Sequence, residues 1–142
     1  MDTAIASFPN INGEESWLGS SRKREELLQK NFLFVYLWSI SCGYCKEVIP
    51  HVINFHRENI QSFHLLSIHV PMGDHDLDVS YVQDEANKLG ISDSLLLDNN
   101  HKWVLWFGSK FLPSFYIYNQ AGQFVNSKIG YENIEEFLQG IG

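Results

Sequence analysis

A pair of cysteines three positions apart, Cys42 and Cys45, marks the point where a strand-like run of the sequence passes into a helix-like one. Residues 32–38 form an apolar run of strand length that is rich in aromatic residues, which is typical of a strand covered on both faces. From residue 42 to about residue 60 the apolar positions follow helical spacing. We therefore expect both cysteines on the first turn of a helix, just past the carboxyl end of an inner strand, where open α/β sheets carry their sites.

The spacing of the two cysteines favours a redox-active dithiol. Two cysteines separated by two residues on the first turn of a helix can bring their sulfurs close enough to form a disulfide without unfolding the chain. The first cysteine then faces the free N–H groups and the positive end of the helix, which favour thiolate over thiol. Cys42 is thus predicted as the nucleophile and Cys45 as the resolving cysteine.

The alternatives for this pair are buried structural thiols and half of a metal site. The chain holds only these two cysteines, whereas an all-cysteine zinc site takes four thiolates. A copper site would need a different cysteine spacing and a suitably placed histidine, and the six histidines are scattered without metal spacing. We expect no metal and no cofactor.

Length, charge and cysteine usage narrow the partners and the compartment. The 142 residues fit one domain, and the formal charge of −7 argues against nucleic acid or an anionic membrane surface as the main partner. Both cysteines stand in one pair, which suits a reducing compartment, and residues 1–12 lack the basic and apolar regions of a signal peptide. We expect a cytoplasmic protein without a membrane span, and a monomer.

Apolar periodicity and turn residues divide the rest of the chain into alternating strands and helices. The predicted strands are residues 32–38, 63–70, 94–97, 114–118 and 123–129, the last two joined by a turn at residues 119–122. The predicted helices are residues 22–30, 42–60, 80–89, 101–107 and 134–141, with a kink at Pro50, a capping box formed by Ser80 and Gln83, and Asn133 as the last N-cap. Residues 7–20 are expected to form a small hairpin or loop. This order implies a sheet with parallel inner strands, one antiparallel edge and helices on both faces.

Residues 34–50, Phe-Val-Tyr-Leu-Trp-Ser-Ile-Ser-Cys-Gly-Tyr-Cys-Lys-Glu-Val-Ile-Pro, resemble the active-site segment of the thioredoxin superfamily. Trp38 four residues before the first cysteine, Lys46 after the second and Pro50 five beyond it match that segment. The strand and helix within residues 69–97, with the N-terminal extension, resemble its TlpA/ResA-like branch, so the resemblance covers nearly the whole chain. It implies an α/β, thioredoxin-like three-layer fold with a mixed central sheet, helices on both faces and a central strand–helix insertion. The chain would then be a single thioredoxin-like domain, residues 1–142, with residues 1–30 as an extension packed on it.

The resemblance also implies an activity and further site residues. Members of the family exchange thiols and disulfides, which implies disulfide-containing protein substrates and an external thiol or reductase for recycling. A cis-proline loop lies opposite the cysteines in the family, here Leu112-Pro113, and Leu112 would offer its backbone to an extended substrate peptide by strand addition. The residues implied to bind substrate or shape the site are Trp38, Gly43, Tyr44, Lys46, Leu112 and Pro113. Core packing for Trp38 and a solvated turn for Tyr44 are the alternative interpretations.

This chain departs from the family at the proton donor. Thioredoxins place a buried carboxylate six residues before the first cysteine, where this chain has Tyr36, and a phenol that titrates near pH 10 is a poor base at neutral pH. A glutamate that the TlpA/ResA-like branch carries after the second strand is also missing. Glu47, Asp74 and Asp76 are the remaining candidates to exchange a proton with Cys45.

The motif is compatible with reaction in either direction. Proteins with this motif range over roughly 150 mV in reduction potential, so a disulfide reductase is the leading hypothesis and a disulfide oxidase or isomerase its alternative. A hypothesis from another class is a non-catalytic redox-sensing binding module, in which oxidation changes a surface rather than turning over substrate.

Overall fold

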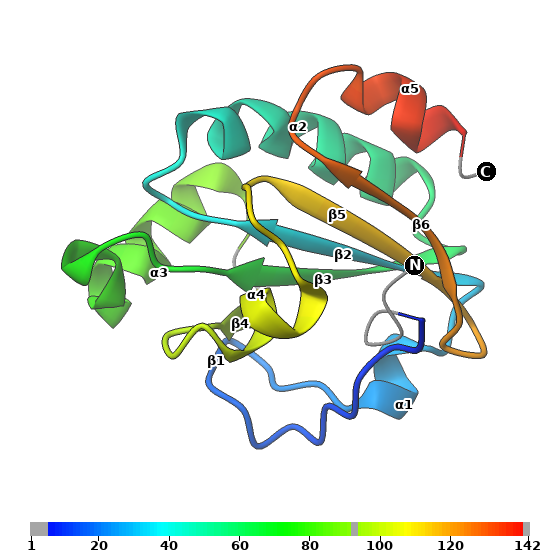
Figure 1. Ribbon diagram of the computed structural model, residues 1–142, viewed down its shortest axis with the longest axis horizontal. Coiled ribbons are helices and arrows are strands. Elements are labelled where there is room, and N and C mark those ends of the chain that lie inside the picture. The colour runs from blue at the N-terminus through cyan, green and yellow to red at the C-terminus, as the bar shows by residue number, and fades with distance from the viewer. Residues whose placement is uncertain (1–5, 92–93, 141–142) are drawn as a thin grey trace.

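The computed structural model describes residues 6–91 and 94–140, and its elements follow the chain in the alternating order that the sequence indicates (Figure 1). The strands are β1 (Trp17–Leu18), β2 (Phe32–Trp38), β3 (Phe63–His69), β4 (Leu95–Leu97), β5 (Ser114–Asn119) and β6 (Phe124–Ile129). The helices are α1 (Arg24–Leu27), α2 (Gly43–Glu58), the 3₁₀ segment η2 (Asp74–Leu77), α3 (Val79–Leu89), α4 (Lys102–Phe107) and α5 (Ile134–Gln139).

The strands form one six-stranded mixed sheet in the order β1-β4-β3-β2-β5-β6. The central strands β2, β3 and β4 are parallel, whereas β5 and β6 run antiparallel on one side. The prediction of one antiparallel edge is wrong, because the sheet has two. Strand β1 pairs antiparallel with β4 on the other side, with Trp17 opposite Leu96. The carboxyl ends of β2 and β3 therefore share one end of the sheet, on the left in Figure 1.

Alternate residues of β2 serve two cores, one on each face of the sheet. Every residue of this strand from Leu33 to Trp38 is buried, as the apolar run predicts. Phe34, Tyr36 and Trp38 pack with α2, α3 and α5. Leu33, Val35 and Leu37 pack with α1 and α4 on the opposite face. The layered thioredoxin-like fold is thereby confirmed, with α2 and α5 above the sheet and α1 and α4 below it in Figure 1.

Several helix ends differ from those predicted. The helix expected over residues 22–30 is only Arg24–Leu27, a length that tertiary packing rather than propensity must sustain. Helix α3 begins at Val79, because the Asp78 carboxylate and not Ser80 caps it by accepting a hydrogen bond from the Tyr81 amide. Asn133 precedes α5 but makes no side-chain cap, and the predicted end of that helix at residue 141 lies outside the described residues.

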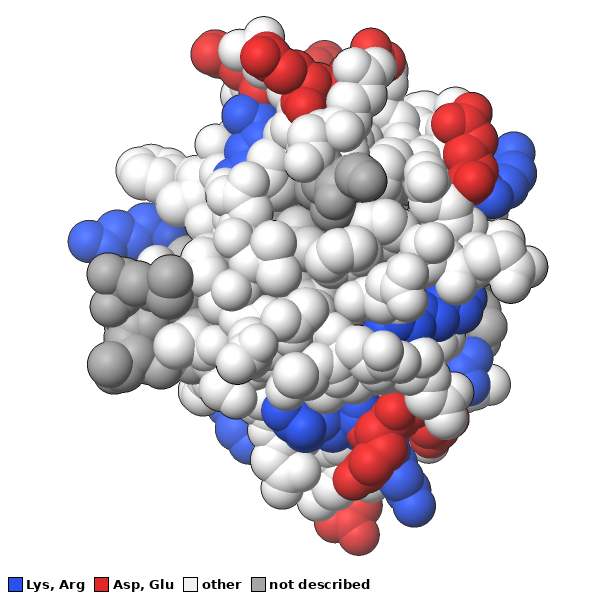
Figure 2. Space-filling model, turned by 90° about the vertical axis from the view of Figure 1, so that its right-hand side faces the viewer, with Lys and Arg blue, Asp and Glu red and all other residues white. Residues whose placement is uncertain are grey.

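Within residues 6–91 and 94–140, no helix combines the length and the apolar character that crossing a membrane requires. The end of the molecule that carries the β5–β6 turn lies opposite the carboxyl ends of β2 and β3. Figure 2 shows that end, where acidic and basic side chains lie among uncharged ones.

Candidate active site

The two cysteines lie where β2 delivers the chain to the amino end of α2. Cys42 is the N-cap residue of this helix, and its sulfur accepts a hydrogen bond of 3.2 Å from the Cys45 amide. The two residues form a disulfide with their Cα atoms 5.2 Å apart. Cys42 keeps 8% of its surface exposed, whereas Cys45 is fully buried. Only the first sulfur can therefore be approached from outside.

A loop from the other side of the site faces Cys42. The Leu112–Pro113 peptide bond is cis, which confirms the expectation for this position. The carbonyl oxygen of Leu112 lies 3.8 Å from the Cys42 sulfur. Between this loop and the segment after β3 runs a groove of about 400 Å³ that includes Cys42, with Met72 and Phe111 among its exposed apolar walls.

The other residues expected at the site lie at different depths. Trp38 is fully buried and donates its indole N–H to the Ser67 hydroxyl at 2.6 Å, so it lies beneath the cysteines rather than on the surface. Gly43 and Tyr44 are exposed, and Lys46 is half-buried. The ring of Tyr44 stacks on Tyr131, with the ring centroids 4.3 Å apart. No sequence pattern predicts Tyr131 at this site, because it follows β6, far along the chain, in a segment without a motif.

Tyr36 occupies the position where thioredoxins carry a buried carboxylate. Its hydroxyl is buried and donates a hydrogen bond of 2.7 Å to the carbonyl oxygen of Cys45. Burial raises the pKa of this phenol far above its ordinary value. Tyr36 therefore stays neutral at physiological pH and exchanges no proton there. Its hydrogen bond stabilises the first turn of α2.

A buried carboxylate lies instead in η2. Asp76 is 1% exposed, and its two oxygens accept hydrogen bonds from the Ser41 hydroxyl at 2.6 Å, the Met72 amide at 2.9 Å and the Ser39 hydroxyl at 3.2 Å. Burial acts to raise the pKa of this carboxyl, but these three hydrogen bonds outweigh it and hold the pKa below its ordinary value. Of the three carboxylates considered as proton carriers, Glu47 and Asp74 are exposed, and Asp76 alone is tied to the loop that ends at Cys42.

His69, at the end of β3, is a second buried titratable group near this loop. It is fully buried against the Trp38 ring, and neither ring nitrogen has a hydrogen-bond partner within the described part of the chain. Desolvation lowers the pKa of His69 to about 4, partly offset by the charge of Asp76. At neutral pH the imidazole is therefore uncharged. No sequence pattern singles out His69, Ser39 or Ser41 beyond their nearness to strand ends.

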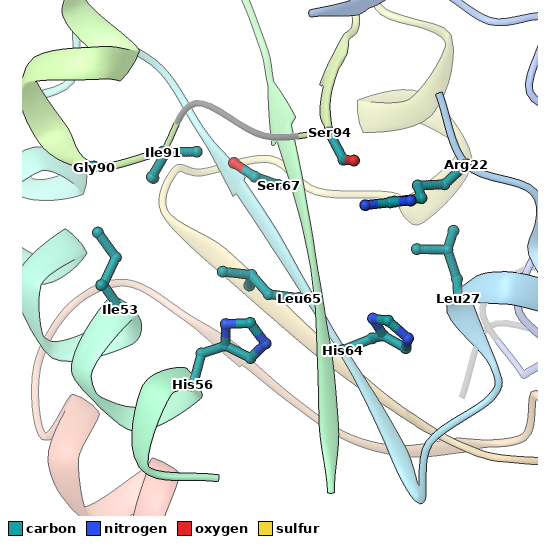
Figure 3. Close-up of a pocket in the computed structure, with 10 residues that line it drawn as sticks. All are labelled: Arg22, Leu27, Ile53, His56, His64, Leu65, Ser67, Gly90, Ile91 and Ser94. Atoms are coloured by element: carbon teal, nitrogen blue, oxygen red, sulfur yellow. The ribbon is translucent and has the colours of Figure 1, made fainter. Parts of the chain in front are cut away.

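Two other features of the described residues bear on the site. Among residues 6–91 and 94–140, no cluster of three or more His, Cys, Asp or Glu side chains could hold a metal ion. A separate pocket of about 250 Å³ lies around β3, with Ile53 and His56 of α2 on one side and Arg22 and Leu27 on the other (Figure 3). Neither cysteine is among the residues that line it.

Comparison with known proteins agrees with this geometry. No family model matches the chain. The chain is 28% identical to the thiol-disulfide oxidoreductase YkuV of Bacillus subtilis over 87% of this chain and 83% of that protein. It is 24% identical to the thioredoxin-like protein SkfH of the same organism over 88% and 87%. A thioredoxin-like protein solved in its oxidised form superposes with a TM-score of 0.86 at 24% identity, over 99% of this chain and 97% of that one.

The hydrogen bond from Tyr36 to Cys45 can be tested against a matched tyrosine. We expect Tyr36→Phe to lower the free energy of unfolding by about 1–2 kcal/mol, because a buried hydrogen bond is lost. Tyr118→Phe should not lower it, because the Tyr118 hydroxyl is buried without a partner in the described residues and its removal breaks no hydrogen bond. Urea unfolding of both variants measures the difference, and equal losses would contradict this role for Tyr36.

Proposed function

We propose that this chain, a thioredoxin-like homologue of thiol-disulfide oxidoreductases, uses Cys42 and Cys45 to reduce disulfides in protein substrates. The observation that carries the proposal is the asymmetry of the pair, since Cys42 reaches the surface and Cys45 is fully buried. The Cys45 amide, 3.2 Å from the Cys42 sulfur, and the positive end of α2 both favour a thiolate at Cys42. A thiolate is the form that attacks disulfides.

The reaction proceeds in two exchanges. The Cys42 thiolate attacks one sulfur of the substrate disulfide, whose S–S bond breaks as a mixed disulfide to Cys42 forms and the other substrate sulfur leaves as a thiolate. Cys45 then attacks the Cys42 sulfur, and its proton is taken up by the substrate thiolate that the first exchange released. This second exchange releases the remaining substrate thiolate and leaves the Cys42–Cys45 disulfide, so the substrate gains two electrons. An external thiol or reductase supplies two electrons to restore the dithiol.

Substrate would bind in the groove beside Cys42. The Leu112 carbonyl, next to the Cys42 sulfur, is placed to accept a backbone N–H from an extended peptide. Binding through the backbone tolerates many sequences, as a general reductase requires. In this proposal Pro113 shapes the loop that presents Leu112, while Gly43 and Tyr44 border the sulfur on the opposite side. Trp38 supports the loop from below, and Lys46 adds positive charge on the first turn of α2.

We also propose a cytoplasmic monomer. A chain whose only two cysteines form one reactive pair suits a reducing compartment, where a thiol or reductase can restore the dithiol. Thiol trapping in intact cells should then find the pair mainly reduced. Recovery of the protein in an exported or membrane fraction would contradict this location, and a dimer in sedimentation would contradict the monomer.

Separate substitution of the two cysteines tests the mechanism. We expect Cys45→Ser to accumulate a mixed disulfide with insulin, because nothing resolves the bond between Cys42 and the substrate. Cys42→Ser should form none, and in both variants the rate of insulin reduction should fall to that of the reductant alone. Non-reducing electrophoresis with mass spectrometry identifies the linked peptides.

The matched pair of variants also separates the alternatives. Trapping through Cys45 in the Cys42→Ser variant would reverse the assigned roles. If neither variant traps substrate and the wild-type chain does not reduce insulin, the dithiol is not that of a protein disulfide reductase.

A further inference from the structure

Asp76 joins three separate parts of the chain beneath the active site. It belongs to η2, it holds the Ser39 and Ser41 hydroxyls of the loop that ends at Cys42, and it holds the Met72 amide that follows β3. Because Ser41 precedes Cys42 directly, chain geometry places the carboxylate within about 12 Å of the Cys42 sulfur. The carboxylate is 1% exposed, so water screens its charge poorly.

The charge of Asp76 is not neutralised by the groups around it. Three neutral donors hold the carboxylate, and they lower its pKa, so it is ionised at neutral pH. His69, the titratable group that approaches from β3, is uncharged at neutral pH because burial lowers its pKa to about 4. The neighbouring charged or titratable groups Asp74, His75 and Asp78 are exposed. Asp76 is therefore a fixed negative charge beside the loop that carries the reactive sulfur.

A fixed negative charge near Cys42 acts against the helix terminus. The Cys45 amide and the positive end of α2 stabilise the thiolate, and Lys110 is a further cationic residue among those that line the groove. A carboxylate at this range disfavours the thiolate by like-charge repulsion. The disulfide carries no charge, so Asp76 acts on the reduced form and leaves the oxidised form almost unaffected.

We propose that Asp76 is a positioning residue that also tunes the couple: its buried carboxylate destabilises the Cys42 thiolate and keeps the Cys42–Cys45 pair a strong reductant. The inference rests on the proposed redox use of the two cysteines and concerns the strength of that reductant. The hydrogen bonds of Asp76 go to Ser39, Ser41 and Met72 and not to a sulfur, and the role proposed for it requires no proton transfer.

Glutathione reduces the Cys42–Cys45 disulfide by thiol–disulfide exchange. Two glutathione thiols reduce the Cys42–Cys45 disulfide, its S–S bond breaks and one glutathione disulfide forms. Of the two thiol protons, one goes to Cys45 and the other to water, because Cys42 is left as the thiolate. Removing the charge of Asp76 therefore shifts this equilibrium towards the reduced protein.

Two isosteric substitutions test the charge. Asp76→Asn removes the buried charge, and Asp74→Asn removes an exposed charge from the same 3₁₀ segment. In glutathione buffers read by thiol trapping, we expect Asp76→Asn to shift the equilibrium constant about threefold to tenfold towards the reduced form, or about 14 to 30 mV. The pKa of Cys42, read from the pH dependence of its alkylation rate, should fall in the same variant. Asp74→Asn should shift the constant by less than about twofold, because water screens its charge.

The measurements distinguish an effect of Asp76 on the redox equilibrium from an effect on the stability of the fold alone. If Asp76→Asn lowers the free energy of unfolding but changes neither the equilibrium constant nor the pKa of Cys42, the tuning role is wrong. An equal shift in Asp74→Asn would also overturn it. Ser41→Ala keeps the charge and removes one hydrogen bond, so it should not shift the equilibrium towards the reduced form.

A second variant decides the matter if Asp76→Asn does not fold. Asp76→Ser also removes the buried charge and keeps a hydroxyl at the position that holds the Ser41 side chain and the Met72 amide. It should likewise shift the glutathione equilibrium towards the reduced form and lower the pKa of Cys42. An unchanged equilibrium constant together with an unchanged pKa of Cys42 in this variant would overturn the inference.

Failure of this inference differs from failure of the proposed function. A wild-type pair that cannot be cycled in glutathione buffers, or that does not reduce insulin, removes the proposed function. A wild-type pair that cycles normally while Asp76→Asn keeps its potential removes only the tuning.

Discussion

The active site depends on the contact between the Cys42 sulfur and the amino end of helix α2. The Cys42 sulfur takes the N-cap position and accepts the Cys45 amide, so the atom that would react also completes the end of the helix. Because α2 starts at the carboxyl end of a central parallel strand, the sulfur lies at the end of the sheet where the loop after β3 and the loop before β5 converge. The same geometry leaves Cys45 one turn inside, covered by the core.

Beneath this helix end lies a layer of buried polar groups that fixes the first turn. Tyr36 binds the Cys45 carbonyl, Trp38 binds Ser67, and Asp76 binds the loop before Cys42. Tyr36 and Trp38 are neutral, whereas Asp76 is charged. The hydrogen bonds of the layer hold the cysteines in place, and in our proposal the charge of Asp76 acts on the Cys42 thiolate. The thiolate is stabilised from the helix and, in our proposal, destabilised from Asp76. The balance of the two decides how strongly the dithiol reduces.

The sequence predicted those parts of the molecule that local pattern determines. The limits of β2 match the apolar run at residues 32–38, and the cysteine pair stands at the predicted strand–helix junction. Strand β1 has only two residues, too few for any periodicity, and its partner Leu96 lies far along the chain. The sequence could not single out Asp76 among three candidate carboxylates. Its hydrogen bond with Ser41 joins residues 35 positions apart, and no local pattern encodes such a pairing.

The proposed function requires that Cys42 and Cys45 form a reducing dithiol, and the reduction potential of this couple measures that property. Equilibration of the whole protein with glutathione or dithiothreitol buffers, read by thiol trapping, gives that potential. For a reducing dithiol we expect a value near that of thioredoxin, about −270 mV. A value towards about −120 mV, typical of a strong oxidant, would contradict it.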